Sequence, residues 1–347
     1  MEQSSTKKMS EPPDVDAQRI PVTVVTGFLG SGKTTLINRI LKEKHGRKIA
    51  VIENEFGEIG IDDGIVFNSQ ENILEMNNGC ICCTVRGDLI KILKKLWKRK
   101  NKIEHVLIET TGLADPAPVA QTFFVDDDVQ EHYRLDAIIT VVDAKHLIQH
   151  LDDDKPEGVE NEAVEQLAFA DKVLLNKVDL VSAEEKQEVV KRIKAINSSA
   201  DIIETVQGNA PLERILEIKA FSLERILEGE PTFLESDGEH QHDSSVTSVG
   251  LELEGEMDMK KLDSWLGAIL REKGTDIFRS KGILAIKGTA DKLVFQGVHM
   301  LMGFASSSEG VGKPWQDGER RVNRIVFIGR HLDRKQLASS FTACLAD

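Results

Sequence analysis

The chain has 347 residues, which is long enough for two domains with their own apolar cores. Its formal net charge of −14 argues against a broad nucleic-acid-binding surface and against docking on an anionic membrane. No apolar run approaches the about 20 residues that a membrane-spanning helix needs. The polar start, residues 1–19, lacks the apolar segment of a secretory signal, and its acidic residues are unlike a transit peptide. We therefore expect a flexible tail there, and we expect no nucleic-acid or membrane partner.

From residue 20 to about residue 230, short apolar runs alternate with amphipathic segments. The apolar runs predict buried strands at 20–26, 49–53, 103–109, 136–142 and 172–176. The amphipathic segments predict helices at 34–44, 88–98, 161–170 and 183–196. This alternation predicts an α/β domain over 20–230, in which a parallel sheet is covered by helices on both faces.

The remainder of the chain predicts a second, smaller domain. Residues 231–245 have little to bury and are the predicted linker. Beyond them, strands are predicted at 245–254, 282–287, 292–298 and 323–328, and helices at 257–272 and 333–344. The first of these helices has one apolar face, formed by Met259, Leu262, Trp265, Leu266 and Ile269. We expect a small α+β domain over 246–347.

A phosphate-binding loop is the clearest functional motif. Residues 27–34, GFLGSGKT, match the pattern G-x-x-x-x-G-K-[ST] between a predicted buried strand and a predicted helix. Backbone amides and the helix N-terminus then face the phosphates. Lys33 should bridge the β- and γ-phosphates, and the Thr34 hydroxyl should ligate Mg²⁺. The predicted phosphate-binding residues are Gly27, Gly30, Ser31, Gly32, Lys33, Thr34 and Thr35.

Two later motifs follow in the order that a GTPase requires. Glu109 ends a predicted strand and can hold Mg²⁺ directly or through water, and Gly112 can approach the γ-phosphate. The motif Asn176-Lys177-Val178-Asp179 closes a later strand. The Asp179 carboxylate can accept two hydrogen bonds from guanine N1 and N2, which adenine cannot offer. GTP is therefore the predicted nucleotide, bound in part by Asn176, Lys177 and Asp179.

The acidic segment 53–63 follows the second predicted strand, where a nucleotide-sensing loop is expected. Glu58 and Asp62 are candidates for Mg²⁺ coordination or for orienting the attacking water, as phosphoryl transfer depends on positioning and charge neutralisation. An ordinary acidic surface loop is the alternative.

Three of the four cysteines, Cys80, Cys82 and Cys83, lie within four residues of each other. Thiolates are soft ligands that suit Zn²⁺ or Cu⁺, with Co²⁺ and Ni²⁺ possible. Three thiolates leave a tetrahedral zinc one ligand short. Glu53 is the predicted fourth ligand, and His242 or water is the weaker candidate. Such a set fits an exchangeable metal site better than a closed four-cysteine site.

A C-x-C-C run requires a turn, and residues 77–79 (Asn-Asn-Gly) supply turn-forming residues just before it. A structural zinc site, a redox-active thiol cluster and inert buried cysteines are the alternatives to exchangeable metal binding. The cysteine pattern suits a reducing compartment, most simply the cytoplasm.

Together these motifs resemble those of the CobW-type GTPases, a family of metallochaperones that includes the zinc-regulated GTPase metalloprotein activators. The matching segments are 27–35 (GFLGSGKTT), 53–62 (ENEFGEIGID), 79–83 (GCICC), 109–116 (ETTGLADP) and 176–179 (NKVD). The resemblance implies an α/β P-loop NTPase fold of the SIMIBI type with a CobW-type C-terminal domain. It also implies Zn²⁺ bound by Cys80, Cys82 and Cys83, and GTP-linked transfer of that metal to a client apo-metalloprotein.

The chain is similar to the zinc-delivering branch that serves a zinc-dependent aminopeptidase, but that branch's cysteine-containing docking motif has no match in residues 1–19. A zinc-sensing GTPase switch that regulates a partner without delivering metal is one alternative function. A P-loop phosphotransferase or ATPase with a structural zinc is another. If nucleotide state changes zinc affinity a thousandfold, the coupling free energy is about 4 kcal/mol.

Overall fold

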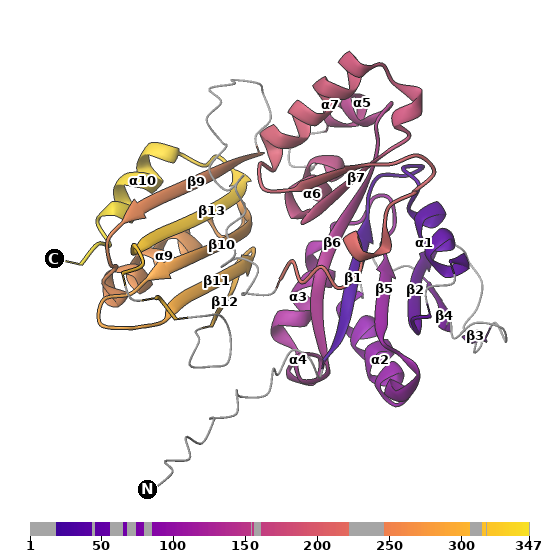
Figure 1. Cartoon of the computed structure of the whole chain (residues 1–347), viewed down its shortest axis with the longest axis horizontal. Helices are drawn as coiled ribbons and strands as arrows, with labels where there is room; N and C mark the ends of the chain where they lie inside the picture. Colours follow the sequence, from indigo (N-terminus) through magenta and orange to yellow (C-terminus); the bar gives the residue numbers. More distant parts are fainter. Residues whose placement is uncertain are drawn as a thin grey trace, which may run out of the picture.

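The computed structural model describes residues 19–43, 46–55, 65–67, 74–79, 85–153, 155, 161–221, 246–305, 314–316 and 318–346. Within these residues the chain forms two sheets, each with its own helices (Figure 1). The predicted tail and the predicted linker lie almost entirely outside the described residues. The domain boundaries at 19, 230 and 245 therefore stay predictions.

The first sheet is the parallel sheet that the alternating pattern predicts. Its eight strands are β1 (Ile20–Thr26), β2 (Ile49–Glu55), β3 (Ile65–Phe67), β4 (Leu74–Gly79), β5 (His105–Glu109), β6 (Tyr133–Asp143), β7 (Lys172–Asn176) and β8 (Asp201–Glu204). They lie in the order β3-β4-β2-β5-β1-β6-β7-β8. All neighbours are parallel except the edge strand β3, which is antiparallel to β4.

Helices cover both faces of this sheet. The helices are α1 (Lys33–Lys42), α2 (Val85–Trp97), α3 (Ala117–Val125), α4 (Asp127–His132), α5 (Leu147–Leu151), α6 (Glu162–Phe169) and α7 (Ala183–Ile196). Short 3₁₀ helices are η2 (Lys100–Lys102), η3 (Val178–Leu180) and η4 (Leu212–Arg214). Because side chains alternate along a strand, Val22 and Val24 of β1 pack with α2 to α7, whereas Val25 packs with α1. The predicted α/β fold class is confirmed.

Several local expectations in this domain were wrong or incomplete. Residues 77–79, predicted as a turn, continue β4, because pairing with β2 through Gly79 supplies the hydrogen bonds that a turn would forgo. The strand predicted at 103–109 begins only at His105, after η2. The edge strands β3 and β8 and helices α3 and α4 gave too short or too weak a pattern to be predicted.

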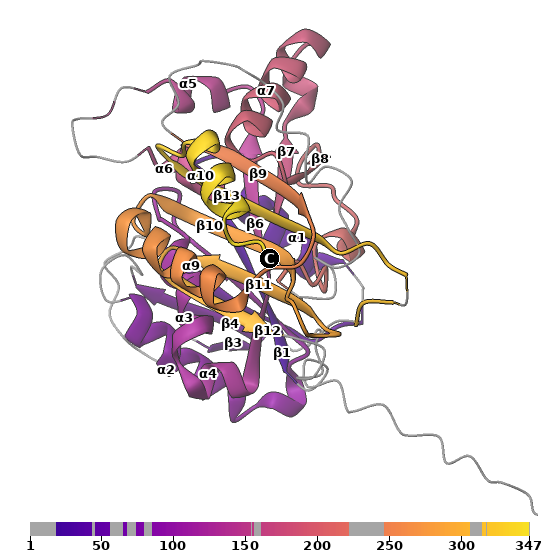
Figure 2. The ribbon, with the colours of Figure 1, turned by 90° about the vertical axis from the view of Figure 1, so that its left-hand side faces the viewer.

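The second sheet is antiparallel and belongs to the C-terminal region. Its strands are β9 (Val246–Glu254), β10 (Ile277–Ala285), β11 (Lys292–Val298), β12 (Leu301–Ala305) and β13 (Val322–Arg330), in the order β12-β11-β10-β13-β9. Helices α9 (Met259–Lys273) and α10 (Arg334–Thr342) cover one face, which is turned toward the viewer in Figure 2. On α9 the predicted apolar face is buried except for Met259, which is 46% exposed because it is the first residue of the helix.

The other face of the second sheet packs against the first domain. Strand β10 contacts α6, β9 contacts α7, and β11 and β12 contact α3. Phe278 and Ile328 of the C-terminal sheet belong to the same apolar cluster as Phe169 of α6. The two domains therefore share a continuous apolar core on this side.

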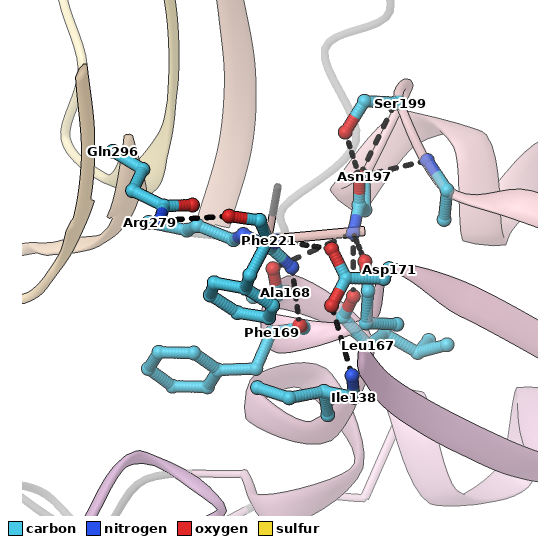
Figure 3. A network of polar contacts seen from close by, with 12 residues as sticks. Ile138, Leu167, Ala168, Phe169, Asp171, Asn197, Ser199, Phe221, Arg279 and Gln296 are labelled. Carbon is cyan, nitrogen blue, oxygen red and sulfur yellow. Dashed lines mark hydrogen bonds and ion pairs between the residues drawn. The ribbon is translucent and has the colours of Figure 1, made fainter. Parts of the chain in front are cut away.

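A buried ion pair lies in this domain interface (Figure 3). Arg279 of β10, which is 5% exposed, donates to the Phe169 carbonyl oxygen at 2.8 Å and pairs with the Asp171 carboxylate. Asp171 also accepts the Ile138 amide at 2.9 Å. The Arg279 guanidinium lies 4.5 Å from the centre of the Phe221 ring. The opposite charges of Arg279 and Asp171 thus neutralise each other where water cannot reach them. This pairing couples the position of β10 to the start of β7.

At the amino end of β5, a buried histidine makes the stability of the fold depend on pH. His105 is 1% exposed, and its Nε2 lies 2.8 Å from the Thr23 hydroxyl. Burial, with smaller contributions from Arg134 and Arg47, lowers the pKa of His105 to about 3. In the unfolded chain this side chain takes up a proton near pH 6.5, whereas the folded protein excludes that proton. The free energy of unfolding therefore falls as pH drops from 6.5 toward 3.

We expect His105→Gln to flatten this dependence. Between pH 7 and pH 5 the wild-type protein should lose about 2 kcal/mol more unfolding free energy than the variant. Urea unfolding at the two pH values measures the difference. His331→Gln, at an exposed position, should keep the wild-type slope. Equal slopes for His105→Gln and the wild-type protein would contradict the assignment.

Candidate nucleotide and metal site

The predicted phosphate-binding loop connects β1 to α1 with a backbone that requires glycine at two points. Gly27 has φ 139°, and a Cβ there would lie 2.1 Å from the Val141 carbonyl oxygen. Gly32 has φ 110°, and its Cβ would lie 2.4 Å from Asn176 Nδ2. Side chains at these positions would both clash and strain the backbone. The loop therefore wraps as tightly as the motif predicts.

Lys33 turns back into this loop. It is 6% exposed, and its Nζ donates to the carbonyl oxygens of Gly27 at 2.7 Å and Phe28 at 3.2 Å. Burial lowers the pKa of Lys33, and the nearby Glu109 carboxylate opposes that shift. Its ammonium group is thus partly desolvated, so the negative charge of phosphate oxygens would be favourable there.

The two predicted Mg²⁺ ligands lie together. Because β1 and β5 are parallel neighbours, their carboxyl ends bring Thr34 beside Glu109, and the Thr34 hydroxyl donates to Glu109 Oε1 at 3.1 Å. Glu109 is 8% exposed. A hydroxyl and a carboxylate are hard oxygen ligands of the kind that Mg²⁺ prefers, so the residues fit this ion.

Gly112 lies against the phosphate-binding loop, as its predicted role requires. A Cβ on Gly112 would come within 2.6 Å of the Leu29 amide nitrogen, so the two backbones touch. The segment after β5 can therefore respond to whatever the phosphate-binding loop holds.

Asn176 of the NKVD motif connects three segments. Its Nδ2 donates to the Ser31 carbonyl oxygen at 3.0 Å, and its Oδ1 accepts from the Thr205 hydroxyl at 3.1 Å and the Gly208 amide at 3.0 Å. Asn176 is 2% exposed, and its side chain holds these loops together. From the sequence, the 205–209 loop is expected by its position to hold a further guanine contact, but no motif marks Thr205 or Gly208, and only the fold brings them to Asn176.

The other two residues of the motif are arranged differently. Lys177 has φ 62°, and its Nζ donates to Asp143 Oδ2 at 2.6 Å. Burial opposes ionisation of Asp143, but hydrogen bonds from Lys177, His146 and the Lys145 amide hold its pKa below the usual value. Asp179 lies on η3 with an exposed side chain that can meet a ligand. Asp143 is a residue that sequence reasoning missed, since an acidic residue at a strand end carries no motif.

Several predicted residues lie outside the described residues: Glu58, Asp62, Cys80, Cys82 and Cys83. For Glu53 only the backbone is described. It lies on β2 opposite Asn77 of β4, and β4 ends at Gly79, the residue before Cys80. Among the described residues, no group of three or more His, Cys, Asp or Glu could hold a metal ion. The zinc ligands therefore stay a prediction.

A parallel sheet with a glycine-rich phosphate loop, an Mg²⁺-type oxygen pair and an NKVD strand end defines a P-loop GTPase. The comparisons agree: the chain matches the CobW/HypB/UreG nucleotide-binding domain over residues 21–204 and the cobalamin synthesis protein CobW C-terminal domain over 246–345. The chain belongs to the CobW/HypB/UreG family of GTPases.

Similar proteins carry names that refer to zinc. The chain is 35% identical to the zinc chaperone YjiA of Escherichia coli over 93% of this chain and 98% of that protein. It is 34% identical to zinc-regulated GTPase metalloprotein activator 1 of Schizosaccharomyces pombe over 91% of this chain and 83% of that protein. The crystal structure of Zn(II)-bound YjiA GTPase from E. coli superposes with a TM-score of 0.74, at 30% identity, covering 94% of this chain and 99% of that one.

In the part of the chain that the structure describes, no helix is both long enough and apolar enough to span a bilayer.

Proposed function

We propose that this GTPase is a zinc chaperone that binds Zn²⁺ through Cys80, Cys82, Cys83 and Glu53 and transfers it to a client metalloprotein. The observation that carries the proposal is the strand order β4-β2-β5-β1. Strand β4 ends just before Cys80, and β2 ends two residues after Glu53. Strand β5 ends at Glu109, and β1 ends at the phosphate-binding loop. Parallel strands present their carboxyl ends at one edge, so the zinc ligands and the nucleotide would be close neighbours.

The strand register supports Glu53 as the residue that links the proposed zinc site to the nucleotide site. Ile52 of β2 pairs with Ile108 of β5, so Glu53 follows beside Glu109. On its other side, Glu53 pairs with Asn77 of β4. A carboxylate between a thiolate cluster and the Mg²⁺ position could bind the zinc ion in one nucleotide state and release it in the other.

For the hydrolysis itself we propose a division of roles. Lys33 and the loop amides hold the β- and γ-phosphates, Thr34 and Glu109 hold Mg²⁺, and Asp179 selects guanine. Bound Mg²⁺ would neutralise the charge that develops on the phosphate oxygens. Glu58 or Asp62 orients the attacking water. The names of the zinc chaperone YjiA and the metalloprotein activator support zinc as the cargo.

The test is to measure zinc affinity with GDP bound and with a non-hydrolysable GTP analogue bound. We expect the affinities to differ about thousandfold, a coupling of about 4 kcal/mol. Replacing Cys80, Cys82 and Cys83 by Ser should remove this binding while leaving GDP affinity unchanged. Cys344→Ser is the matched control, because that thiol is buried in the C-terminal domain and donates to the Ser340 carbonyl oxygen.

Equal zinc affinities in the two nucleotide states would contradict delivery driven by GTP. Transfer is then checked directly by mixing zinc-loaded protein and GTP with an apo-metalloprotein, beginning with a zinc-dependent aminopeptidase. Activation of the apoenzyme that requires GTP supports the chaperone. A large affinity shift without transfer to any apoenzyme would instead indicate a zinc-sensing switch.

A further inference from the structure

A buried glutamine holds the loop that follows Glu109. Gln166 lies on α6, is 1% exposed, and donates through Nε2 to the carbonyl oxygens of Gly112 at 3.1 Å and Ala114 at 3.2 Å. Both hydrogens of its amide are thus used on this one loop. The Thr140 hydroxyl donates to the backbone carbonyl oxygen of Gln166 at 2.7 Å, which anchors α6 to β6.

These contacts are specific to the side chain. The Gly112 carbonyl oxygen is buried and needs a donor, so leaving it unpaired costs about 1–3 kcal/mol, whereas the Ala114 carbonyl oxygen is only partly buried. Of the uncharged side chains, only an amide of this length offers two donors in the required geometry. Gly112 also touches the phosphate-binding loop at Leu29. The position of the 112–114 loop beside the phosphates therefore depends on Gln166.

The carboxyl end of α6, three residues after Gln166, is fastened to the C-terminal domain. Arg279 of β10 binds the Phe169 carbonyl oxygen and the Asp171 carboxylate, directly after the helix (Figure 3). Asn197 secures the same turn, because its Nδ2 donates to the carbonyl oxygens of Leu167 at 2.9 Å and Ala170 at 2.8 Å. Helix α6 has eight residues, a rigid element about 12 Å long.

We propose that Gln166 is a positioning residue for the GTPase: it holds the 112–114 loop for contact with the γ-phosphate, and through α6 it carries the state of that loop to the C-terminal domain. The proposal rests on the proposed nucleotide site. A loop that moves with the γ-phosphate must either break its bonds to Gln166 or shift α6 against β10. A shift of α6 is favoured, because breaking the bonds would leave the buried Gly112 carbonyl oxygen unpaired.

The first experiment compares Gln166→Met with wild type in the full-length protein, using GDP and a non-hydrolysable GTP analogue. Methionine keeps the length of the side chain but has no donor. We expect affinity for the GTP analogue to fall about tenfold and GDP affinity to change less than twofold. Gln187→Met, on the exposed face of α7, is the matched control and should change neither value. If the methionine variant does not fold, Gln166→Asn takes its place. It keeps the amide but shortens its reach, and it should change the affinities in the same direction.

An equal fall in affinity for both nucleotides would indicate a merely structural role and overturn the proposal. Unchanged affinity for both nucleotides would also overturn it. Failure of the nucleotide site itself is distinguishable, because the wild-type protein would then not bind GDP. The second measurement is amide exchange of β10 with each nucleotide. We expect exchange to depend on the nucleotide in wild type and not in Gln166→Met. A dependence that persists in the variant would overturn the connection to the C-terminal domain.

Discussion

Replacing Asp179 by Asn should remove the preference for GTP over xanthosine triphosphate, a change of about 10⁴-fold in relative kcat/KM. Guanine presents two donors, N1–H and the C2 amino group, which match the two oxygens of a carboxylate. Xanthine presents N1–H and a C2 carbonyl, which match the oxygen and the amino group of Asn. The exposed position of Asp179 on η3 leaves its side chain available for this contact.

Competition between the two nucleotides measures this ratio. The phosphate-binding loop and the Asn176 contacts to Ser31 and Gly208 stay in place, so hydrolysis of the accepted nucleotide should continue. Asp263→Asn makes the same change at an exposed position of α9 and should leave the ratio unchanged. An Asp179→Asn variant that still prefers GTP would show that another group selects the base.

Replacing Arg279 by Met should lower the free energy of unfolding by about 3–5 kcal/mol, because the Asp171 carboxylate is left buried without its counter-charge. Asp171 has a side chain that is 3% exposed, so water cannot take the place of the guanidinium. The Phe169 carbonyl oxygen also loses its donor. Chemical denaturation followed by circular dichroism gives the change. Arg271→Met on the exposed side of α9 is the control and should have little effect.

A second substitution separates the charge from the packing. In the double variant Arg279→Met with Asp171→Asn, the buried charge is gone while an amide oxygen remains for the Ile138 amide. We expect the double variant to recover part of the lost stability. If it is no more stable than Arg279→Met alone, then the unpaired carboxylate is not the cause and lost contacts with Phe221 are the better explanation.

Local sequence patterns predicted the central strands and most long helices because each pattern reports burial along a single element. Strands β1 and β7 and helix α7 have the predicted bounds. The edge strand β8 was missed because it is short and half-exposed, so it has no clear apolar alternation. The end of β4 was predicted as a turn because Asn and Gly favour turns when no partner strand is known, and the pairing with β2 outweighs that preference.

The candidate site divides in the same way. Glycines, Lys33 and Thr34 were predicted because contiguous residues carry the phosphate-binding chemistry in a single loop. The sequence alone therefore determined the family, the α/β class and the nucleotide motifs, for which spacing along the chain is itself the physical requirement.

Only the tertiary structure decided which distant residues serve those motifs. Gln166 reaches the loop of Gly112 from a different helix, and Thr205 and Gly208 reach Asn176 from a loop without a motif. Arg279 meets Asp171 across the two domains, 108 residues apart in the chain. Such contacts are set by strand order and packing, which bring together residues whose positions in the sequence have no fixed relation.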